Sequence, residues 1–246
     1  MSQRPDPTFA APAATPSRGE RFLIGFFVLP GGDRRFDCLH LTPDPDGWSG
    51  ALTRLGSGES EADRFALQAT ETASRLEITL DALDGAARQR LTVDARTQGS
   101  ENGHIATLDG RADDPSPLPR LAYILEEVGR VRLAPSPTHG WGVVARQAIA
   151  KGEEVLIVRG PIGMNQTPYS FRCATGQHVE PTGYGHFVNH SCVPSCHIAY
   201  REGGRPCLIA NRDLEPDDEV TFDYTLTEGA LANAFDCRCP AEIHKV

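Results

Sequence analysis

The side chains that could do chemistry gather toward the C-terminal end of the chain. Of the seven cysteines, Cys38 stands alone and the others all lie from residue 173 onward. An odd number of cysteines, behind an N-terminus without the apolar run of a signal peptide, argues against a disulfide framework. In a reducing compartment such a cluster binds a metal ion or packs in the core, and both alternatives stay open at this point. The clustered residues are Cys173, Cys192, Cys196, Cys207, Cys237 and Cys239.

Four polar motifs accompany these cysteines. A Gly-Trp-Gly turn lies within residues 138–145, an Asn-His-Ser-Cys-x-Pro run within 186–196, a Glu-Val-Thr-Phe-Asp-Tyr strand over 219–224, and a Cys-x-Cys pair at 237–239. Singly, the first and third are typical of ordinary turns and strands. The second is more informative, because few loops need an amide, an imidazole, a hydroxyl and a thiol in a row. The order of the four motifs carries more information than any one of them.

Short β-strands are the elements expected to position these motifs, and the predicted fold class is mainly β. Residues 21–110 contain a series of short strand-like runs separated by turn signals such as Pro-Gly-Gly-Asp at 30–33, which predicts an antiparallel meander, a sandwich or a small barrel. Residues 82–90 could instead form a short helix, and residues 121–128 are predicted to form one. From about residue 129, further short strands alternate with Gly and Pro turns.

The chain is expected to divide into five parts. Residues 1–20, rich in Pro, Ala, Ser and Thr, are predicted to be a disordered tail. Residues 21–112 are predicted to form a β-rich domain, whose role no motif indicates. Residues 113–128 would be a linker and a short helix. Residues 129–234 would form a second domain that carries the first three motifs, and 235–246 a tail that carries the Cys-x-Cys pair.

The charge balance narrows the classes of partner. The net charge is −9, from 24 basic and 33 acidic residues. A nucleic-acid surface needs clustered Lys and Arg, which the sequence lacks, so a cationic partner is the better expectation. The longest apolar stretch, 22–30, is far shorter than the roughly 20 residues of a membrane helix. Neither nucleic acid nor membrane is therefore an expected partner, and the protein is expected in the cytoplasm, or in the nucleus of a eukaryote.

The motifs in this order resemble the SET domain family of lysine methyltransferases. The family's order is Gly-x-Gly, Asn-His-Ser-Cys-x-Pro, Glu-hydrophobic-Thr-Phe-Asp-Tyr and then Cys-x-Cys, and the resemblance covers about residues 129–246. It implies a SET fold over 129–234, built of small β-sheets with a knot-like crossing, and a degenerate post-SET-like tail over 235–246. It implies nothing about the preceding β-rich domain.

The resemblance also implies S-adenosylmethionine as the cofactor. Residues 139–142 match the family's cofactor loop, where missing side chains let the backbone approach the ligand. Residues 189 and 190 match those that hold the amino-acid and adenine ends of the cofactor. The implied cofactor-binding residues are His139, Gly140, Trp141, Gly142, Asn189 and His190.

Two tyrosines are implied in catalysis. Tyr224 matches the family's catalytic tyrosine, and Tyr169 is the best match for a second tyrosine of the lysine channel, with Tyr184 and Tyr200 as weaker alternatives. Methyl transfer needs a neutral amine, yet free lysine has a pKa of about 10.4. An apolar channel beside the sulfonium lowers that pKa by desolvation and like charge. Tyr224 would orient the amine and accept weak C–H···O contacts from the methyl group.

A zinc site is implied by the cysteines, with alternatives left open. Family members often close the lysine channel with one zinc, held by the cysteine of Asn-His-Ser-Cys and by a C-terminal Cys-x-Cys-x₄-Cys. Here the ligands would be Cys192, Cys237, Cys239 and His244, since three cysteines with one histidine are a standard structural set. Cys196 could replace His244. Alternatively the tail binds no metal, because a proline follows the Cys-x-Cys pair where glycine is usual.

Two further departures weaken expected contacts. Ser195 stands where the family usually has asparagine, and its shorter side chain is expected to loosen the crossing. His186 stands where the family often has arginine, three residues before Asn189.

The resemblance as a whole implies an S-adenosylmethionine-dependent protein-lysine N-methyltransferase with a cationic protein or peptide substrate. Two alternatives remain. The same pocket could act on a small-molecule amine, because the stretch between residues 160 and 186 that shapes substrate choice is short. The domain could also be a non-catalytic module that binds the cofactor or a partner.

Overall fold

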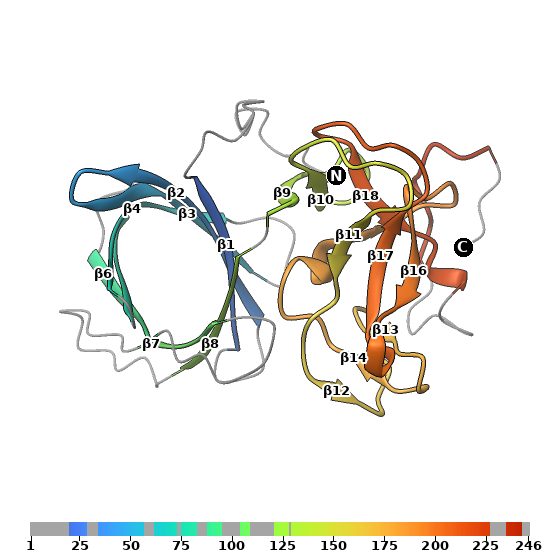
Figure 1. Cartoon of the computed structure of the whole chain (residues 1–246), viewed down its shortest axis with the longest axis horizontal. Coiled ribbons are helices and arrows are strands. Elements are labelled where there is room, and N and C mark those ends of the chain that lie inside the picture. The colour runs from blue at the N-terminus through green and yellow to red at the C-terminus, as the bar shows by residue number, and fades with distance from the viewer. Residues whose placement is uncertain are drawn as a thin grey trace. The chain divides into compact units, whose positions relative to one another are not determined.

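The structure, a computed structural model, divides the chain into two compact units with the boundary between Gly129 and Arg130 (Figure 1). The prediction of a mainly β protein is confirmed. Most of the tail predicted over 1–20, and the linker up to residue 120, lie outside the described residues. The described residues are 20–28, 34–56, 62–72, 75–82, 88–94, 104–108, 121–127, 129–226 and 235–242.

The N-terminal unit is one antiparallel sheet of eight strands in the order β6-β5-β4-β3-β2-β1-β8-β7. The edge strands β6 and β7 lie next to each other, so the sheet curls into a barrel (Figure 1). Of the three predicted all-β arrangements, a barrel in which most consecutive strands are neighbours is the one that forms. The strands are β1 (Arg21–Val28), β2 (Arg34–Asp44), β3 (Gly47–Gly56), β4 (Ala62–Thr72), β5 (Arg75–Ala82), β6 (Arg88–Asp94), β7 (His104–Leu108) and β8 (Leu121–Glu127).

One face of this sheet combines an apolar core with a buried ion pair. Leu39 lies opposite Leu52, which lies opposite Phe65, and all three are buried. Asp37, two residues before Leu39 on β2, is fully buried and lies opposite Arg54. The Arg54 guanidinium donates to both carboxylate oxygens at 2.7 and 3.0 Å, and it also covers the Phe65 ring. The arginine thus neutralises a carboxylate that the core excludes from water.

Replacing Arg54 with alanine is expected to lower the free energy of unfolding of this unit by about 3–5 kcal/mol, because the buried charge of Asp37 loses its partner. Chemical denaturation followed by the fluorescence of Trp48 on β3 would measure the change. Arg64→Ala, on an exposed position of β4, is the matched control. The double variant with Asp37→Ala should recover part of the loss. A cost of less than about 1 kcal/mol for Arg54→Ala, the level of a surface pair, would contradict the account.

The helix predicted at 121–128 is wrong over its described part, which is strand β8. Leu121–Glu127 pairs with β7 on one side and with β1 on the other. A short apolar run satisfies helix and strand patterns equally, and pairing on both edges decides the outcome. The helix considered for 82–90 does not form over the described residues either, because β5 ends at Ala82 and β6 begins at Arg88.

The C-terminal unit consists of three small sheets joined by short turns and 3-10 helices. Their orders are β15-β18-β10-β9, β11-β17-β16 and β12-β14-β13. No helix among the described residues is long and apolar enough to cross a bilayer. The elements are β9 (Val131–Pro135), β10 (Trp141–Ala145), β11 (Glu154–Ile157), β12 (Ile162–Gly163), β13 (Phe171–Arg172), β14 (His178–Val179), η1 (Tyr184–Phe187), β15 (Asn189–His190), β16 (Cys196–Tyr200), η2 (Glu202–Gly204), β17 (Pro206–Ala210), β18 (Glu219–Phe222) and η3 (Tyr224–Leu226).

Strand β18 lies at the centre of the arrangement that matters for function. It pairs with β10 on one edge and, in parallel, with β15 on the other. Segment 189–195 is held to β18 at both ends, as the expected knot-like crossing requires. At its far end the Ser195 hydroxyl donates to the Glu219 carbonyl at 2.8 Å and accepts from the Thr221 N–H at 2.9 Å. The expectation that Ser195 loosens the crossing is therefore wrong: the short hydroxyl reaches β18 directly.

Candidate functional site

The loop before β10 is a tight turn closed by a residue that the sequence analysis did not single out. Ser136 is buried, and its Oγ accepts hydrogen bonds from the Thr138 and His139 N–H groups at 3.2 and 3.3 Å. Its own N–H donates to the Gly140 carbonyl at 2.8 Å. Gly140 has a φ of 53°, in the left-handed region that favours glycine. The turn therefore presents the predicted cofactor loop in a fixed conformation.

Gly142 makes room for side chains of the other two motifs. A Cβ at this position would lie 2.5 Å from the Glu219 Oε1 and 3.0 Å from the Asn189 Nδ2. The Asn189 amide in turn donates to that carboxylate at 2.8 Å and to the Trp141 carbonyl at 3.0 Å. The glycine was predicted to let the backbone approach a ligand, but here its open side admits Asn189 and Glu219. The three motifs are thus joined through one amide.

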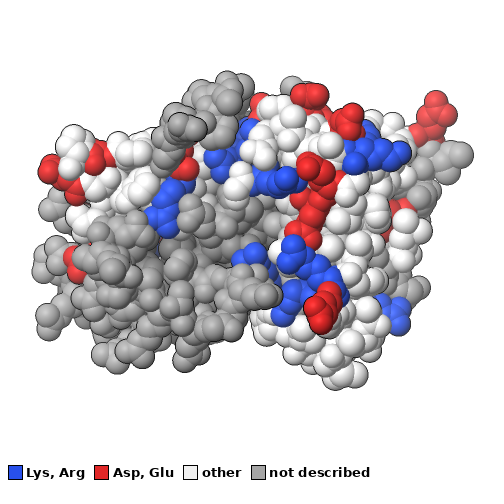
Figure 2. Space-filling view, viewed as in Figure 1, with Lys and Arg blue, Asp and Glu red and all other residues white. Residues whose placement is uncertain are grey.

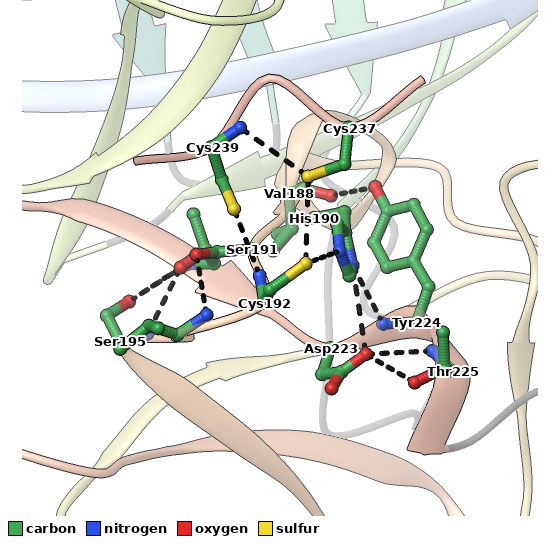
Figure 3. Close-up of polar contacts among 12 residues, drawn as sticks. Val188, His190, Ser191, Cys192, Ser195, Asp223, Tyr224, Thr225, Cys237 and Cys239 are labelled. Carbon is green, nitrogen blue, oxygen red and sulfur yellow. Dashed lines mark hydrogen bonds and ion pairs between the residues drawn. The ribbon is translucent and has the colours of Figure 1, made fainter. Parts of the chain in front are cut away.

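His190 bridges the third motif and the thiols. Its ring is buried, its Nδ1 accepts a hydrogen bond from the Tyr224 backbone N–H at 3.2 Å, and its Nε2 lies 3.3 Å from the Cys192 Sγ (Figure 3). Because Nδ1 accepts, the proton of the neutral ring lies on Nε2 and points at the sulfur. Asp223, also buried, lies 3.9 Å from Nδ1 and accepts two hydrogen bonds from Thr225. In this arrangement the His190 Nε2–H donates to the Cys192 sulfur.

Tyr224 is a neutral phenol whose hydroxyl proton is held in a hydrogen bond. Its hydroxyl donates to the Val188 carbonyl at 2.7 Å (Figure 3). Burial raises its pKa well above the ordinary value, and the negative charges of Glu219 and of an ionised Tyr169 raise the pKa further. The phenol therefore stays protonated at neutral pH, and its remaining lone pair is the group that can face a substrate.

Tyr169 lies in the connection between β12 and β13. It is 44% exposed and stacks on the His186 ring at 4.2 Å between centroids. Tyr184 is buried in η1, and Tyr200 is exposed on β16. Of the three candidates, Tyr169 is the one that stacks on His186, two residues before the Val188 carbonyl that accepts the Tyr224 hydroxyl.

Phe235 was missed by sequence reasoning. Its ring lies edge-on to His139, His190 and Tyr224, at centroid distances of 6.1, 5.6 and 6.0 Å. A single phenylalanine outside the motifs carries no signal of its own, and its position two residues before the Cys-x-Cys pair is the only hint. It connects the cofactor loop, the Asn-His-Ser-Cys segment and the tyrosine in one aromatic cluster.

Three of the four predicted metal ligands come together. The Cys192 and Cys237 sulfurs are 3.8 Å apart, and the Cys239 sulfur accepts from the Cys192 backbone N–H at 3.4 Å (Figure 3). Two thiolates in a tetrahedral zinc site, with Zn–S bonds of about 2.3 Å, are separated by about 3.8 Å. Among the described residues, the ligand atoms of His190, Cys192 and Cys237 form a group compact enough to hold a metal ion. The donor set and its spacing therefore fit zinc.

The pKa shifts of these thiols favour the binding of a cation. At Cys239 burial opposes ionisation, but hydrogen bonds from the Cys192 and Ala241 backbone and from the two neighbouring thiols lower its pKa to about 6. Burial, and hydrogen bonds with the other two thiols, raise the pKa of Cys237 to about 11. The thiolate form of Cys239 is thus stabilised, whereas the thiolate form of Cys237 beside it is disfavoured. A divalent cation removes that conflict by binding both.

The fourth ligand is not settled by the described residues, because His244 lies outside them. Cys196, the alternative, is fully buried on β16, where burial raises its pKa to about 11, and it is not part of the compact group. Cys173 and Cys207 are buried as well, as expected of core residues, whereas Cys38 is half-buried on β2.

Comparison with protein families decides the nature of this unit. The SET domain family model matches residues 140–225, which run from the Gly140 turn to η3 and include Tyr224. Residues 140–225 are a SET domain. The match covers the strands β10, β15 and β18, which bring the three motifs together, and it leaves the barrel outside.

Proteins similar to this chain include fungal histone methyltransferases. An H3 lysine-4-specific histone-lysine N-methyltransferase of Schizosaccharomyces pombe is 26% identical over 85% of this chain and 25% of its own length. The Yarrowia lipolytica protein of the same description is 31% identical over 45% of this chain and 11% of its own. The chain thus spans a quarter or less of these relatives. A solved Plasmodium falciparum structure, described as a candidate histone methyltransferase, is 22% identical over 39% of this chain and 94% of its own, with a TM-score of 0.34.

Several arginines of the C-terminal unit are paired with carboxylates. Figure 2 shows basic and acidic side chains interleaved on the visible face. Arg201 pairs with Glu154 through two hydrogen bonds of 2.7 and 2.6 Å, and Arg212 pairs with Asp218.

Proposed function

We propose that this chain is an S-adenosylmethionine-dependent methyltransferase that acts on a lysine ε-amine of a cationic protein segment. The single observation that carries the proposal is the Tyr224 phenol, held by the Val188 carbonyl at the junction of three SET motifs. The histone methyltransferases among its relatives favour a histone-like substrate, and the protein would work in the cytoplasm or, in a eukaryote, the nucleus.

The site suits a cationic cofactor. Loop 139–142, Asn189 and His190 would hold S-adenosylmethionine, beside the Glu219 carboxylate and the edge-on Phe235 ring. A carboxylate and aromatic rings are the groups that stabilise a sulfonium in a partly dry site. When bound, the cofactor supplies the methyl group, and the protein's part is to orient and to exclude water.

Tyr224 would act as a neutral acceptor and not as a general base. Its proton is committed to Val188, so a lone pair is left to accept weak C–H···O contacts and to align the amine. The amine must lose its proton before transfer. Burial and a neighbouring sulfonium lower the lysine pKa, whereas Glu219 acts in the opposite direction, so the first two effects must outweigh the carboxylate.

A structural zinc would complete the site. Cys192, Cys237 and Cys239 would bind it, with His244 as the proposed fourth ligand. The metal would supply no chemistry to the reaction; it would anchor residues 235–242 and therefore Phe235.

The test is methyl transfer by the full chain from tritiated S-adenosylmethionine to histone H3, to core histones and to total lysate protein. We expect labelled lysine in at least one protein sample, and calorimetric binding of the cofactor. Cofactor binding without labelled protein would overturn the protein substrate and favour a small-molecule amine. No cofactor binding at all would leave a non-catalytic module.

A further inference from the structure

Tyr169 needs support from outside its own turn. It lies 44% exposed in the connection between β12 and β13. The backbone of that turn is well fixed, because the Tyr169 N–H donates to the Thr167 Oγ1 at 3.2 Å and this hydroxyl donates to Glu180 at 2.7 Å. The Ser170 hydroxyl closes the turn on the Thr167 carbonyl at 3.1 Å. None of these bonds sets the side-chain torsions of Tyr169.

The ring of His186 is one group that restricts these torsions. The two rings stack with centroids 4.2 Å apart and planes inclined by 28°. His186 is braced in turn by the edge of Phe187, at 5.1 Å, and lies on η1. An aromatic ring stacked at this distance restricts rotation of an otherwise exposed phenol.

The same short segment orients the other tyrosine. Two residues after His186, the Val188 carbonyl accepts the Tyr224 hydroxyl at 2.7 Å. Residues 186–188 thus contact both tyrosines, one through a ring and one through a carbonyl.

We infer that His186 is a positioning residue that holds the Tyr169 ring beside the segment that orients Tyr224, and so shapes the entrance for the substrate's lysine. The inference rests on the proposed function, and it assigns a role to a histidine that stands where the resemblance predicted a weakened contact. His186 acts through Tyr169 and touches neither the methyl group nor the amine.

The test compares His186→Ala with His186→Phe, which keeps a stacking ring, and with His197→Ala, a matched control on an exposed position of β16. The substrate is a peptide of the histone H3 N-terminus. We expect His186→Ala to raise KM for the peptide by about 3- to 10-fold, with kcat and cofactor Kd near wild type. His186→Phe should stay within about twofold of wild type, as a ring in the same place keeps the stack.

The decisive comparison is made in a Tyr169→Ala background. If His186 acts through Tyr169, His186→Ala adds nothing to the Tyr169→Ala defect, whereas additive effects would overturn the inference. The NMR ring-proton shifts of Tyr169, assigned by comparison with Tyr169→Ala, give a readout without activity. Loss of the ring-current shift and of restricted ring motion in His186→Ala, restored in His186→Phe, supports the inference even if wild type labels no H3 peptide. The absence of H3 labelling would count only against the proposed function. Ring signals that are the same in His186→Ala and in wild type would overturn the inference.

Discussion

Tyr224→Phe is expected to lower kcat by about 100-fold while the Kd for S-adenosylmethionine stays within about twofold of wild type. The hydroxyl is buried and bonded to the Val188 carbonyl, so its removal takes away one precisely placed acceptor and leaves the aromatic ring. Misplacement of reacting groups by about 1 Å costs a rate of this order. Cofactor affinity should survive, because the ring still packs against His190, Phe222 and Phe235.

Single-turnover transfer from tritiated cofactor to histone H3 would measure the rate, and calorimetry the affinity. Tyr200→Phe is the matched control, since that tyrosine is 46% exposed on β16. An equal loss in both variants would point to unfolding rather than to chemistry. A Tyr224→Phe variant that keeps more than about half of the wild-type rate would rule out the proposed role of the hydroxyl.

The geometry around Tyr224 also excludes one mechanism. A general base must ionise near the working pH. Burial and the Glu219 carboxylate push the Tyr224 pKa in the opposite direction, away from neutrality. Under the proposed function, the proton of the lysine must therefore go to an acceptor other than Tyr224.

Patterns within short runs of the sequence predicted the strands whose formation depends mainly on neighbouring residues. Most strands of the barrel follow from short runs of sequence. What the patterns missed depends on partners far along the chain. Strand β8 forms because β1 lies beside it, about a hundred residues away, although its own sequence also suits a helix.

The same reason explains what the sequence left open within the site. The space beside Gly142 holds the Glu219 carboxylate, which only the pairing of β10 with β18 brings there. Ser195 was expected to loosen the crossing, yet its reach to the β18 backbone could be known only from the fold. Phe235 contacts the site from the C-terminal segment and belongs to no motif.

The second prediction with a large expected effect concerns the zinc content of the protein. Wild-type full chain, purified after expression with added zinc, is expected to contain about one equivalent of zinc, and Cys239→Ser less than about half. Losing a thiolate ligand should weaken binding by at least about 100-fold, more than the loss of an outer-shell partner. Cys239 is the best target because hydrogen bonds lower its pKa to about 6 despite burial, so its thiolate forms readily at neutral pH.

Cys196→Ser is the matched control, because that thiol is buried in β16 outside the compact group and should keep the metal. His244→Ala then distinguishes the fourth ligand: after cobalt substitution, its visible absorption should change if His244 binds, and remain as in wild type if another group does.

Because the thiols anchor residues 235–242, the loss of metal should also release Phe235 from His190 and Tyr224 and weaken cofactor binding. Full zinc content in Cys239→Ser, or less than about half an equivalent in wild type, would show that the tail closes the site without a metal.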